Sequence, residues 1–307
     1  MPDPSVAIVI LYLDQREALI ACLQSCGKID YDNYEIIVVE NGSLSVQDWR
    51  EAMGSAGPVR VVWSATNIGY ARGNNLGIRD AWNRGAAYIL LLNDDTVVAP
   101  EFLRLLVAAG EQAPDVGALG PAIFHLDDPT KIWFAGAKFD RDECDVRNLN
   151  DTEWAAGASR AVRDSDYVTG CCVLMKRGTI DRVGLLDERF FLYWEDTDWG
   201  LRVKASGLRN VVVPTARIWH RVSVSSGGVD SPLRVYHKTR SHLFFARRYA
   251  PAALPKVHKR FMRDVAWLAL KSRTHGRLTV ARAIASAVRD FHLRRTGAGP
   301  AWLWRKR

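Results

Sequence analysis

The sequence has no apolar run close to the roughly 20 residues that a membrane-spanning helix needs. Its longest apolar runs, residues 6–13 and 88–92, have the length of β-strands. The first residues, MPDPS, lack the basic stretch and apolar segment of a secretory signal, so we expect the chain to stay in the cytoplasm. With 48% hydrophobic and 25% charged residues among 307, the composition excludes a disordered chain, a collagen-like repeat and a coiled-coil rod. The length predicts one or two domains with a sizeable core.

Cysteine is scarce, and the spacing of the cysteines does not predict a set of disulfides. The five cysteines are Cys22, Cys26, Cys144, Cys171 and Cys172. Their number is odd and none forms a Cys-x-x-Cys pair, so we expect no disulfide framework, and a zinc site has little support. We interpret Cys22 and Cys26, four residues apart on a predicted helix, as small buried hydrophobic residues.

Acidic residues are nearly missing from the last quarter of the chain. Residues 231–307 contain 19 Lys and Arg and two Asp, a net charge of +17, whereas the whole chain has +8 and residues 1–230 therefore carry −9. Such an asymmetry predicts an anionic partner or surface for the C-terminal segment.

This basic segment also has apolar residues at helical spacing. They are Phe261, Val265, Leu268 and Ala269, then Val280, Ile284, Val288 and Phe291, with Lys and Arg between them, and the chain ends in AWLWRKR. The pattern predicts basic amphipathic helices. Three interpretations stay open: a peripheral anchor on an anionic membrane, with the two tryptophans at the interface, a helical cap with a solvated basic face, or a nucleic-acid contact. No zinc-finger or RRM signature supports the third, and we expect no nucleic acid as partner.

Strands and helices alternate over the first 121 residues. Strands are expected at 6–13, 34–40, 59–63, 88–92 and 116–121, and helices at 16–26 (capped by Asp14), 46–53, 71–83 and 101–112. This alternation predicts a mostly parallel α/β sheet with helices on both faces. Beyond residue 124 we expect loops, a strand at 167–175, a helix at 198–205 that Asp198 can cap, and short strands at 211–213 and 217–220.

Polar clusters follow three of the predicted strands. They are Asn41-Gly42-Ser43, Asn67-Ile68-Gly69 and Asn93-Asp94-Asp95. Because ligands of open α/β sheets bind beyond the C-terminal strand ends, the three clusters predict one shared site.

The cluster at 93–95 places two adjacent carboxylates directly after a buried strand. A hard divalent cation such as Mg²⁺ or Mn²⁺, shared with a diphosphate, would relieve their repulsion and desolvation. An Asx-type turn is the competing interpretation.

A second acidic cluster, WEDTDW at 194–199, lies among aromatic residues. A carboxylate enclosed by aromatic rings is a candidate general base, because desolvation raises its proton affinity. The same acids also suit a helix N-terminus, and the two interpretations are compatible.

Two further patterns have structural as well as functional interpretations. His220 follows a short strand, and a lone histidine is more often structural, but after two acid clusters it can be a third metal ligand. Residues 67–77, NIGYARGNNLG, match neither a GxGxxG fingerprint nor a Walker A loop; they suit phosphate and sugar contacts or a Gly-rich helix start.

Taken in order, these motifs resemble the family 2 glycosyltransferases, and more narrowly their rhamnosyltransferase-like branch. The resemblance covers about residues 5–250 and rests on VAIVILYL at 6–13, IIVVENGS at 36–43, NIGYARGNNLGI at 67–78, LLLNDDT at 90–96, YVTG at 167–170 and FFLYWEDTDWGLR at 190–202. It implies a GT-A fold over residues 1–230, with a donor half at about 1–120 and an acceptor half at about 121–230. Residues 231–307 would then be a basic helical extension.

The resemblance also implies residue roles. The general base matches Asp196, with Glu195 beside it. The implied metal ligands for Mg²⁺ or Mn²⁺ are Asp95, His220 and Asn93. The implied donor-binding residues are Glu40, Asn41, Asn67, Gly69, Gly73, Asn74, Asn93 and Asp94, and the implied acceptor-binding residues are Tyr193, Trp194, Gly170 and Trp199.

The implied reaction is an inverting transfer of a sugar from a nucleotide-diphosphate donor. The branch suggests L-rhamnose from dTDP-L-rhamnose, delivered to a hydroxyl of a cell-surface glycan or lipid-linked acceptor at the inner membrane face. Two residues depart from the family pattern: Glu40 replaces the usual Asp, and Asn93 replaces the first Asp of the metal motif. The rival interpretations are a non-catalytic sugar-nucleotide or glycan-binding module on the same fold and a nicotinamide-dependent oxidoreductase, which lacks its phosphate fingerprint here.

Overall fold

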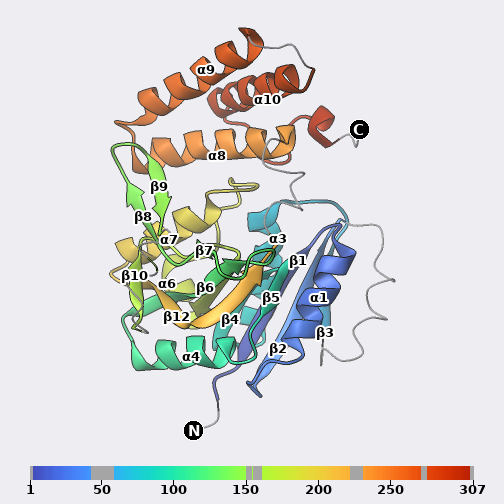
Figure 1. Ribbon diagram of the computed structural model, residues 1–307, viewed down its shortest axis with the longest axis vertical. Coiled ribbons are helices and arrows are strands. Elements are labelled where there is room, and N and C mark those ends of the chain that lie inside the picture. The colour runs from blue at the N-terminus through green and yellow to red at the C-terminus, as the bar shows by residue number, and fades with distance from the viewer. Residues whose placement is uncertain are drawn as a thin grey trace.

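A computed structural model describes residues 3–42, 59–149, 154, 161–221, 231–270 and 275–304. One large mixed sheet with helices against its faces forms the body, and three helices lie together above it (Figure 1). Among the described residues, no helix is long and apolar enough to cross a membrane.

The N-terminal half alternates strands and helices, as the sequence predicts. The elements are β1 (Val6–Tyr12), α1 (Arg16–Cys26), β2 (Tyr34–Asn41), β3 (Val59–Ser64), α3 (Tyr70–Asn83), β4 (Tyr88–Asn93), β5 (Thr96–Val98), α4 (Phe102–Gln112) and β6 (Val116–His125). The helix predicted at 46–53 lies outside the described residues. The N-cap position of α1 is held by Gln15 and not by Asp14, and the Gln15 side chain makes no capping hydrogen bond.

The second half adds five strands of three to five residues, the 12-residue strand β12 and two described helices to the body. They are β7 (Ile132–Phe134), β8 (Ala137–Asp140), β9 (Asp145–Asn148), β10 (Arg163–Ser165), β11 (Cys172–Lys176), α6 (Arg177–Val183), α7 (Glu195–Ala205) and β12 (Arg209–His220). The β8–β9 hairpin reaches up toward the C-terminal helices (Figure 1).

The main path of the sheet runs β10-β12-β6-β11-β4-β1-β2-β3. β1 pairs in parallel with both β2 and β4, so that Tyr12 lies opposite Glu40 and Leu11 opposite Asn93. β11 runs antiparallel between β4 and β6. The C-terminal ends of β1, β2 and β4 therefore meet at one edge, as the three polar clusters predict.

Three predicted elements differ from the structure. The strand expected at 167–175 begins only at Cys172, because residues 169–172 form a turn closed by the Cys172 N–H on the Thr169 carbonyl, 3.2 Å. The strands expected at 211–213 and 217–220 are one strand, β12, with a register shift between Val213 and Arg217. α7 begins at Glu195, so Asp198 lies inside the helix and does not cap it.

Apolar side chains cover both faces of the sheet. One cluster packs Ile8 and Ile10 of β1 against α1 and α4, and the other packs Val9 with α3 and Trp199 of α7. This follows from the strand period of two, which sends alternate residues of β1 to opposite faces. All five cysteines are buried and free, and the predicted burial of Cys22 and Cys26 is confirmed.

The basic C-terminal segment is helical, as predicted. It comprises α8 (Pro232–Tyr249), α9 (Leu254–Leu270), α10 (His275–His292) and a 3-10 turn, η2 (Ala301–Trp304). The apolar stripes of these helices pack against one another, with Phe245, Val265, Ile284 and Phe291 in a single cluster. The predicted domain boundary at 230/231 lies between the undescribed stretch 222–230 and the start of α8.

Candidate active site

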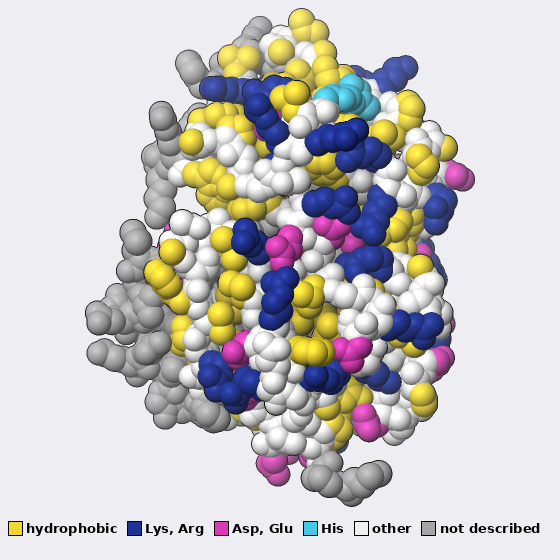
Figure 2. All heavy atoms as spheres, turned by 180° about the vertical axis from the view of Figure 1, so that it is seen from behind, with side chains coloured by type: hydrophobic (Ala, Val, Ile, Leu, Met, Phe, Trp, Pro, Cys, Tyr) yellow, Lys and Arg dark blue, Asp and Glu magenta, His cyan; other side chains and the backbone are white. Residues whose placement is uncertain are grey.

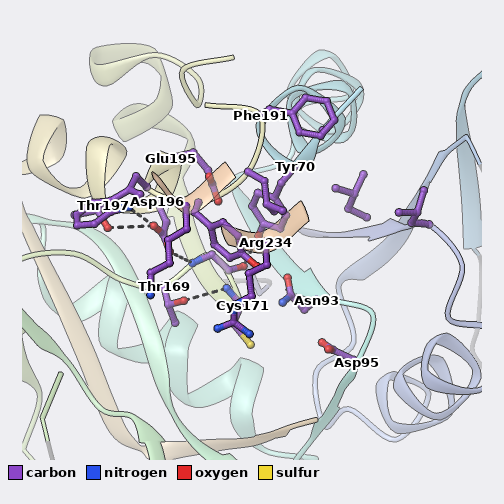
Figure 3. Close-up of a pocket in the computed structure, with 18 of the residues that line it drawn as sticks. Tyr70, Asn93, Asp95, Thr169, Cys171, Phe191, Glu195, Asp196, Thr197 and Arg234 are labelled. Carbon is purple, nitrogen blue, oxygen red and sulfur yellow. Dashed lines mark hydrogen bonds between the residues drawn. The ribbon is translucent and has the colours of Figure 1, made fainter. Parts of the chain in front are cut away.

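A cavity of about 540 Å³ lies beyond the C-terminal ends of β1, β2 and β4. It brings together most of the residues predicted from the sequence (Figure 3). The predicted residues that line it are Asn41, Asn67, Gly69, Asn93, Asp94, Asp95, Gly170, Tyr193, Trp194, Glu195, Asp196 and His220. Segments far apart in the sequence therefore form one site.

Four predicted residues do not reach the cavity. Glu40 is completely buried within β2. Gly73 faces Leu11, whose Cδ1 would lie 2.4 Å from an added Cβ, so this glycine serves the packing of α3 on β1. Asn74 is buried and donates to the Tyr70 carbonyl, 3.0 Å. The Trp199 ring belongs to the core and donates to the Gly184 carbonyl, 2.9 Å.

Two asparagines organise the loop after β3. The Asn41 side chain donates to Asn67 Oδ1, 3.2 Å, and its own oxygen accepts from the Ile68 N–H, 2.9 Å. Asn67 Oδ1 also accepts from the Gly69 N–H, 2.9 Å. These bonds hold the start of α3 against the end of β2, where a nucleotide would lie in a sheet of this type.

Tyr70 joins this loop to two other parts of the site. Its backbone N–H donates to the Phe191 carbonyl, 2.7 Å, and its hydroxyl to the Gly170 carbonyl, 2.6 Å. Burial, reinforced by Glu195 and Asp196, raises the Tyr70 pKa well above its ordinary value, so the hydroxyl stays protonated and acts as a donor. Sequence analysis had not assigned a role to Tyr70.

Asp196 is a partly buried carboxylate held in one orientation. Its Oδ2 accepts from the Gly170 N–H, 2.9 Å, and its Oδ1 from the Thr197 N–H, 2.6 Å. Burial raises its pKa, while these hydrogen bonds oppose the rise. The result is a carboxylate that is fixed in position and has enhanced proton affinity, as a general base requires.

Glu195 lies next to Asp196 and differs from it in its contacts. Its Oε2 is buried and makes no hydrogen bond within the described part of the chain. Burial, then the charge of Asp196, raises its pKa well above the ordinary value, which favours the protonated form. A protonated Glu195 can donate a hydrogen bond to a ligand in the cavity.

Asp95 and His220 meet at the other side of the cavity. β12 pairs with β5 so that His220 lies opposite Thr96, and His220 Nε2 comes within 3.1 Å of Asp95 Oδ1. The buried Asp95 Oδ1 makes no hydrogen bond within the described residues. The neighbouring Asp94 has its pKa raised well above normal by burial and then by Asp95. Over the described ranges, no group of three or more His, Cys, Asp or Glu side chains gathers as a metal centre.

The C-terminal helices complete the cavity, which sequence analysis did not anticipate. Leu233, Arg234 and Lys238 of α8 and Trp304 of η2 line it. Trp304 packs edge-on against Phe191, with ring centroids 5.9 Å apart. The only sequence signal for these residues was the basic, tryptophan-containing composition of the segment, which does not predict where it packs.

Side chains of α8 also contact the acidic cluster and the residues that precede it, through ring stacking and hydrogen bonds. His237 stacks on Phe191 and His242 stacks on Trp194, with centroids 4.8 Å and 4.3 Å apart. Asp198 accepts from Arg248, 2.8 Å, and from the Tyr249 hydroxyl, 2.7 Å. The segment that precedes α7, with Phe191 and Trp194, is therefore packed against α8.

Comparison with known families gives one match that covers most of the body. A model described as Glycosyl transferase family 2 matches residues 7–183.

Curated relatives agree with this match. The chain is 32% identical over 255 residues to the uncharacterized protein y4gI of Sinorhizobium fredii, which covers 80% of this chain and 28% of that protein. It is 25% identical over 249 residues to an N-acetylglucosaminyl-diphospho-decaprenol L-rhamnosyltransferase of Mycobacterium tuberculosis, covering 70% and 75%. It is 22% identical over 258 residues to the dTDP-rhamnosyl transferase RfbF of Shigella flexneri, covering 79% of each. The chain thus spans less than a third of the first of these relatives.

Solved structures share the fold. GalNAc-T7 with UDP, GalNAc and Mn²⁺ superimposes with a TM-score of 0.64 at 14% identity, over 94% of this chain and 56% of that one. A mannosyltransferase of Pyrobaculum calidifontis with GDP-Man and Mn²⁺ gives 0.57 at 16% identity, over 96% and 90%. At these identities the likeness concerns the fold alone.

Proposed function

This chain belongs to glycosyl transferase family 2, in its rhamnosyltransferase-like branch, and has the GT-A type of fold; from this we propose a specific reaction for it. The proposed reaction is the inverting transfer of a sugar from a nucleotide-diphosphate donor to a hydroxyl of a glycan or lipid-linked acceptor. The observation that carries it is the position of Asp196, a partly buried and oriented carboxylate in the same cavity as the Asn41–Asn67 loop and the Asp95–His220 pair.

Asp196 is the proposed general base. The acceptor hydroxyl would lose its proton to this carboxylate while its oxygen attacks the anomeric carbon of the sugar. The bond from that carbon to the diphosphate oxygen breaks on the opposite face, and the nucleoside diphosphate leaves with the bonding electrons. The Gly170 and Thr197 N–H bonds support this role, because they hold the carboxylate in a single orientation.

A protonated Glu195 is the proposed partner of Asp196. Its free, buried Oε2 supports a hydrogen bond to a substrate hydroxyl. Tyr193 and Trp194, which line the cavity beside it, suit the apolar face of a sugar ring.

The residues around Asp95 fit a divalent cation. A buried carboxylate oxygen without a hydrogen bond, 3.1 Å from a histidine nitrogen, is a convergence of two ligand atoms. Asp95 and His220 would hold Mg²⁺ or Mn²⁺, with the amide oxygen of Asn93 as a further ligand. When bound, the cation would neutralise charge on the diphosphate of the donor.

The donor proposed is dTDP-L-rhamnose. Support comes from the names of two relatives, an L-rhamnosyltransferase acting on a diphospho-decaprenol-linked sugar and a dTDP-rhamnosyl transferase. We propose the same classes of donor and lipid-linked or cell-surface acceptor for this chain.

We further propose that the C-terminal helices contact an anionic membrane at the inner face. Figure 2 shows Lys and Arg side chains interspersed with hydrophobic ones over the upper part of the molecule. Trp267 of α9 and Leu278 of α10 are about half exposed, at 50% and 49%, and Leu270 is 87% exposed. By contrast, Trp304 faces the cavity and donates to the Ala298 carbonyl, so the support comes from the α9–α10 pair and not from the terminal tryptophans.

Replacing Trp267 and Leu270 together by Ser tests the membrane contact without truncating the chain. Sedimentation with vesicles of one-third phosphatidylglycerol should fall for this variant, while its thermal stability stays near that of the unmodified protein. Equal sedimentation of both proteins would refute the contact.

Donor binding tests the proposed reaction directly. Thermal stabilisation by dTDP-, UDP- and GDP-sugars is measured with and without Mn²⁺ or Mg²⁺, followed by release of the nucleoside diphosphate with an acceptor present. Ligand at about 100 times its dissociation constant should add roughly 2.7 kcal/mol to the free energy of unfolding. Stabilisation without any turnover would favour the alternative, a non-catalytic sugar-nucleotide-binding module.

A further inference from the structure

Arg234 comes from outside the matched family region and points into the cavity. It lies in the first turn of α8, and Figure 3 shows its side chain among Asn93, Cys171 and Tyr70. Its guanidinium lies 5.9 Å from the centre of the Tyr193 ring. Lys238 lines the same cavity one helical turn further along, on the same face of α8.

α8 is held firmly where these two residues meet the cavity. The Ser231 hydroxyl caps the helix by accepting from the Arg234 N–H, 3.2 Å. The Ser241 hydroxyl donates to the Leu192 carbonyl, 2.9 Å, and His237 stacks on Phe191. The cations are therefore presented from a helix that is already fixed to the loop carrying the acidic cluster.

The charges that line the cavity indicate a role for Arg234 and Lys238. The described lining of the cavity includes six acidic residues and two Arg and Lys residues: Asp14, Asp94, Asp95, Asp145, Glu195 and Asp196, with Arg234 and Lys238. An anionic ligand would be repelled by the carboxylates unless cations offset them. A cation in the first turn of a helix is also opposed by the helix dipole.

We propose that Arg234 and Lys238 form a diphosphate-binding subsite that α8 contributes to the cavity. The planar guanidinium suits paired phosphate oxygens, and Lys238, which is more exposed, adds a second charge at the rim. The proposal rests on the proposed function, because a glycosyl donor carries a diphosphate, and so does a lipid-linked acceptor of the kind named for one relative. The shared chemistry is the diphosphate, and the experiment separates its two sources.

The test measures binding of simple probes by titration calorimetry. The probes are inorganic pyrophosphate, then dTDP, UDP and GDP, each compared with its nucleoside at constant Mn²⁺. Arg234→Gln and Lys238→Gln are compared with Arg263→Gln, a control that removes the same charge as Arg234→Gln from an exposed position on α9. Nucleoside affinity and thermal melting show whether each variant is folded.

Arg234→Gln should weaken pyrophosphate and nucleoside diphosphate binding by about tenfold or more, and Lys238→Gln by less. Nucleoside binding and the Arg263→Gln control should be unchanged. In a second outcome, nucleoside diphosphate affinity is unchanged but the KM for a diphospho-lipid acceptor rises. If the KM for a phosphate-free acceptor then stays the same, the subsite binds the diphosphate of the acceptor. Unchanged dissociation constants and KM values for all these ligands would refute the diphosphate-binding subsite.

The same titrations separate this inference from the proposed function. A chain that binds pyrophosphate through Arg234 but neither binds nor turns over any nucleotide sugar keeps the subsite and loses the glycosyltransferase reaction. A chain that transfers sugar with unchanged kinetics after Arg234→Gln keeps the reaction and loses the subsite.

Discussion

The backbone N–H of Gly170 donates a hydrogen bond of 2.9 Å to Oδ2 of Asp196. Gly170 lies in the turn before β11, and Asp196 lies in the first turn of α7, so the bond joins two segments that are 26 residues apart. The carbonyl of Gly170 accepts from the Tyr70 hydroxyl at the same time. Gly170 thus joins the proposed base to Tyr70 at the start of α3 through its two backbone groups.

Replacing Asp196 with Asn should remove turnover and spare donor binding. We expect kcat to fall by about 10²–10⁴, because a positioned base contributes that much. In the unmodified protein, the rate should rise with pH through the raised pKa of Asp196, since burial favours its protonated, inactive form at low pH. Steady-state kinetics against pH and nucleotide titration provide the measurements. A variant with normal kcat would exclude Asp196 as the base.

Glu195→Gln should stabilise the protein more at high pH than at low pH. The raised pKa of Glu195 means that its ionised form opposes folding, so its contribution to stability is present at low pH and is lost as pH rises through the folded-state pKa. Gln cannot ionise and avoids this loss. Melting temperatures from pH 5 to 8.5 measure the effect. In domains of about 150–250 residues, a change of about 1 kcal/mol in the free energy of unfolding shifts the melting temperature by about 2–4 °C. Glu17→Gln, at an exposed position on α1, is the control, and a difference independent of pH would contradict the argument.

Asp95→Asn and His220→Gln should each weaken the dependence of nucleotide binding on Mn²⁺. Removing either ligand atom from the pair should lower the apparent Mn²⁺ affinity by at least about tenfold, as even outer-shell changes do in metal sites. Donor-induced thermal shifts over a Mn²⁺ series give the affinity. Asp32→Asn, an exposed aspartate before β2, should leave the series unchanged. Equal Mn²⁺ dependence in all four proteins would argue against a metal at this position.

Gly69→Ala should destabilise the protein more than Gly85→Ala. Both glycines have positive φ, 89° and 86°, and with ψ of 171° Gly69 lies in a region that is essentially confined to glycine, so alanine is strained there. At Gly69 the added Cβ would also lie 2.6 Å from the Phe191 carbonyl oxygen, whereas at Gly85 it meets nothing within 4 Å. Denaturant unfolding of the two variants compares the strain and the Phe191 contact at Gly69 with the strain alone at Gly85. Equal losses of stability would show that this contact is unimportant.

His237→Phe should make the protein less sensitive to acid. Burial lowers the pKa of His237 to about 3, so this residue contributes stability above pH 6.5 that is lost as pH falls toward 3. Phe can keep the stack on Phe191 without taking up a proton. Urea unfolding measures the free energy of unfolding between pH 7 and 4.5. This free energy should decrease less steeply with falling pH in the variant. An unchanged slope would assign the acid sensitivity to other groups.

The sequence predicted the N-terminal half of the fold well because its signals are local. Continuous apolar runs such as residues 6–13 and 34–40 predicted buried parallel strands, and the structure has them as β1 and β2. Asn41 ends β2 and Asn93 ends β4, and because both strands run parallel to β1, the sequence predicts that these two side chains lie at one edge of the sheet.

Misplaced residues came from segments whose environment depends on distant parts of the chain. Trp199 lies in the predicted acidic motif, but its ring packs in the core one turn further along α7 than Glu195, which lines the cavity. The segment at 167–171 has the composition of a strand, yet it forms the turn whose N–H binds Asp196. Composition does not distinguish these outcomes, because a hydrogen bond to another segment decides them.

By itself, the sequence determined the family, the parallel arrangement of the first strands, the helical nature of the basic segment and the acidic residues available for chemistry. Only the tertiary structure decided that β12 pairs with β5 to bring His220 to Asp95, and that α8 and η2 turn back to place Arg234 and Trp304 in the cavity. Periodicity and turn residues act over a few positions and can be read from the chain. Which faces pack together depends on the burial of apolar surface between segments more than one hundred residues apart, and that is settled only when the whole chain folds.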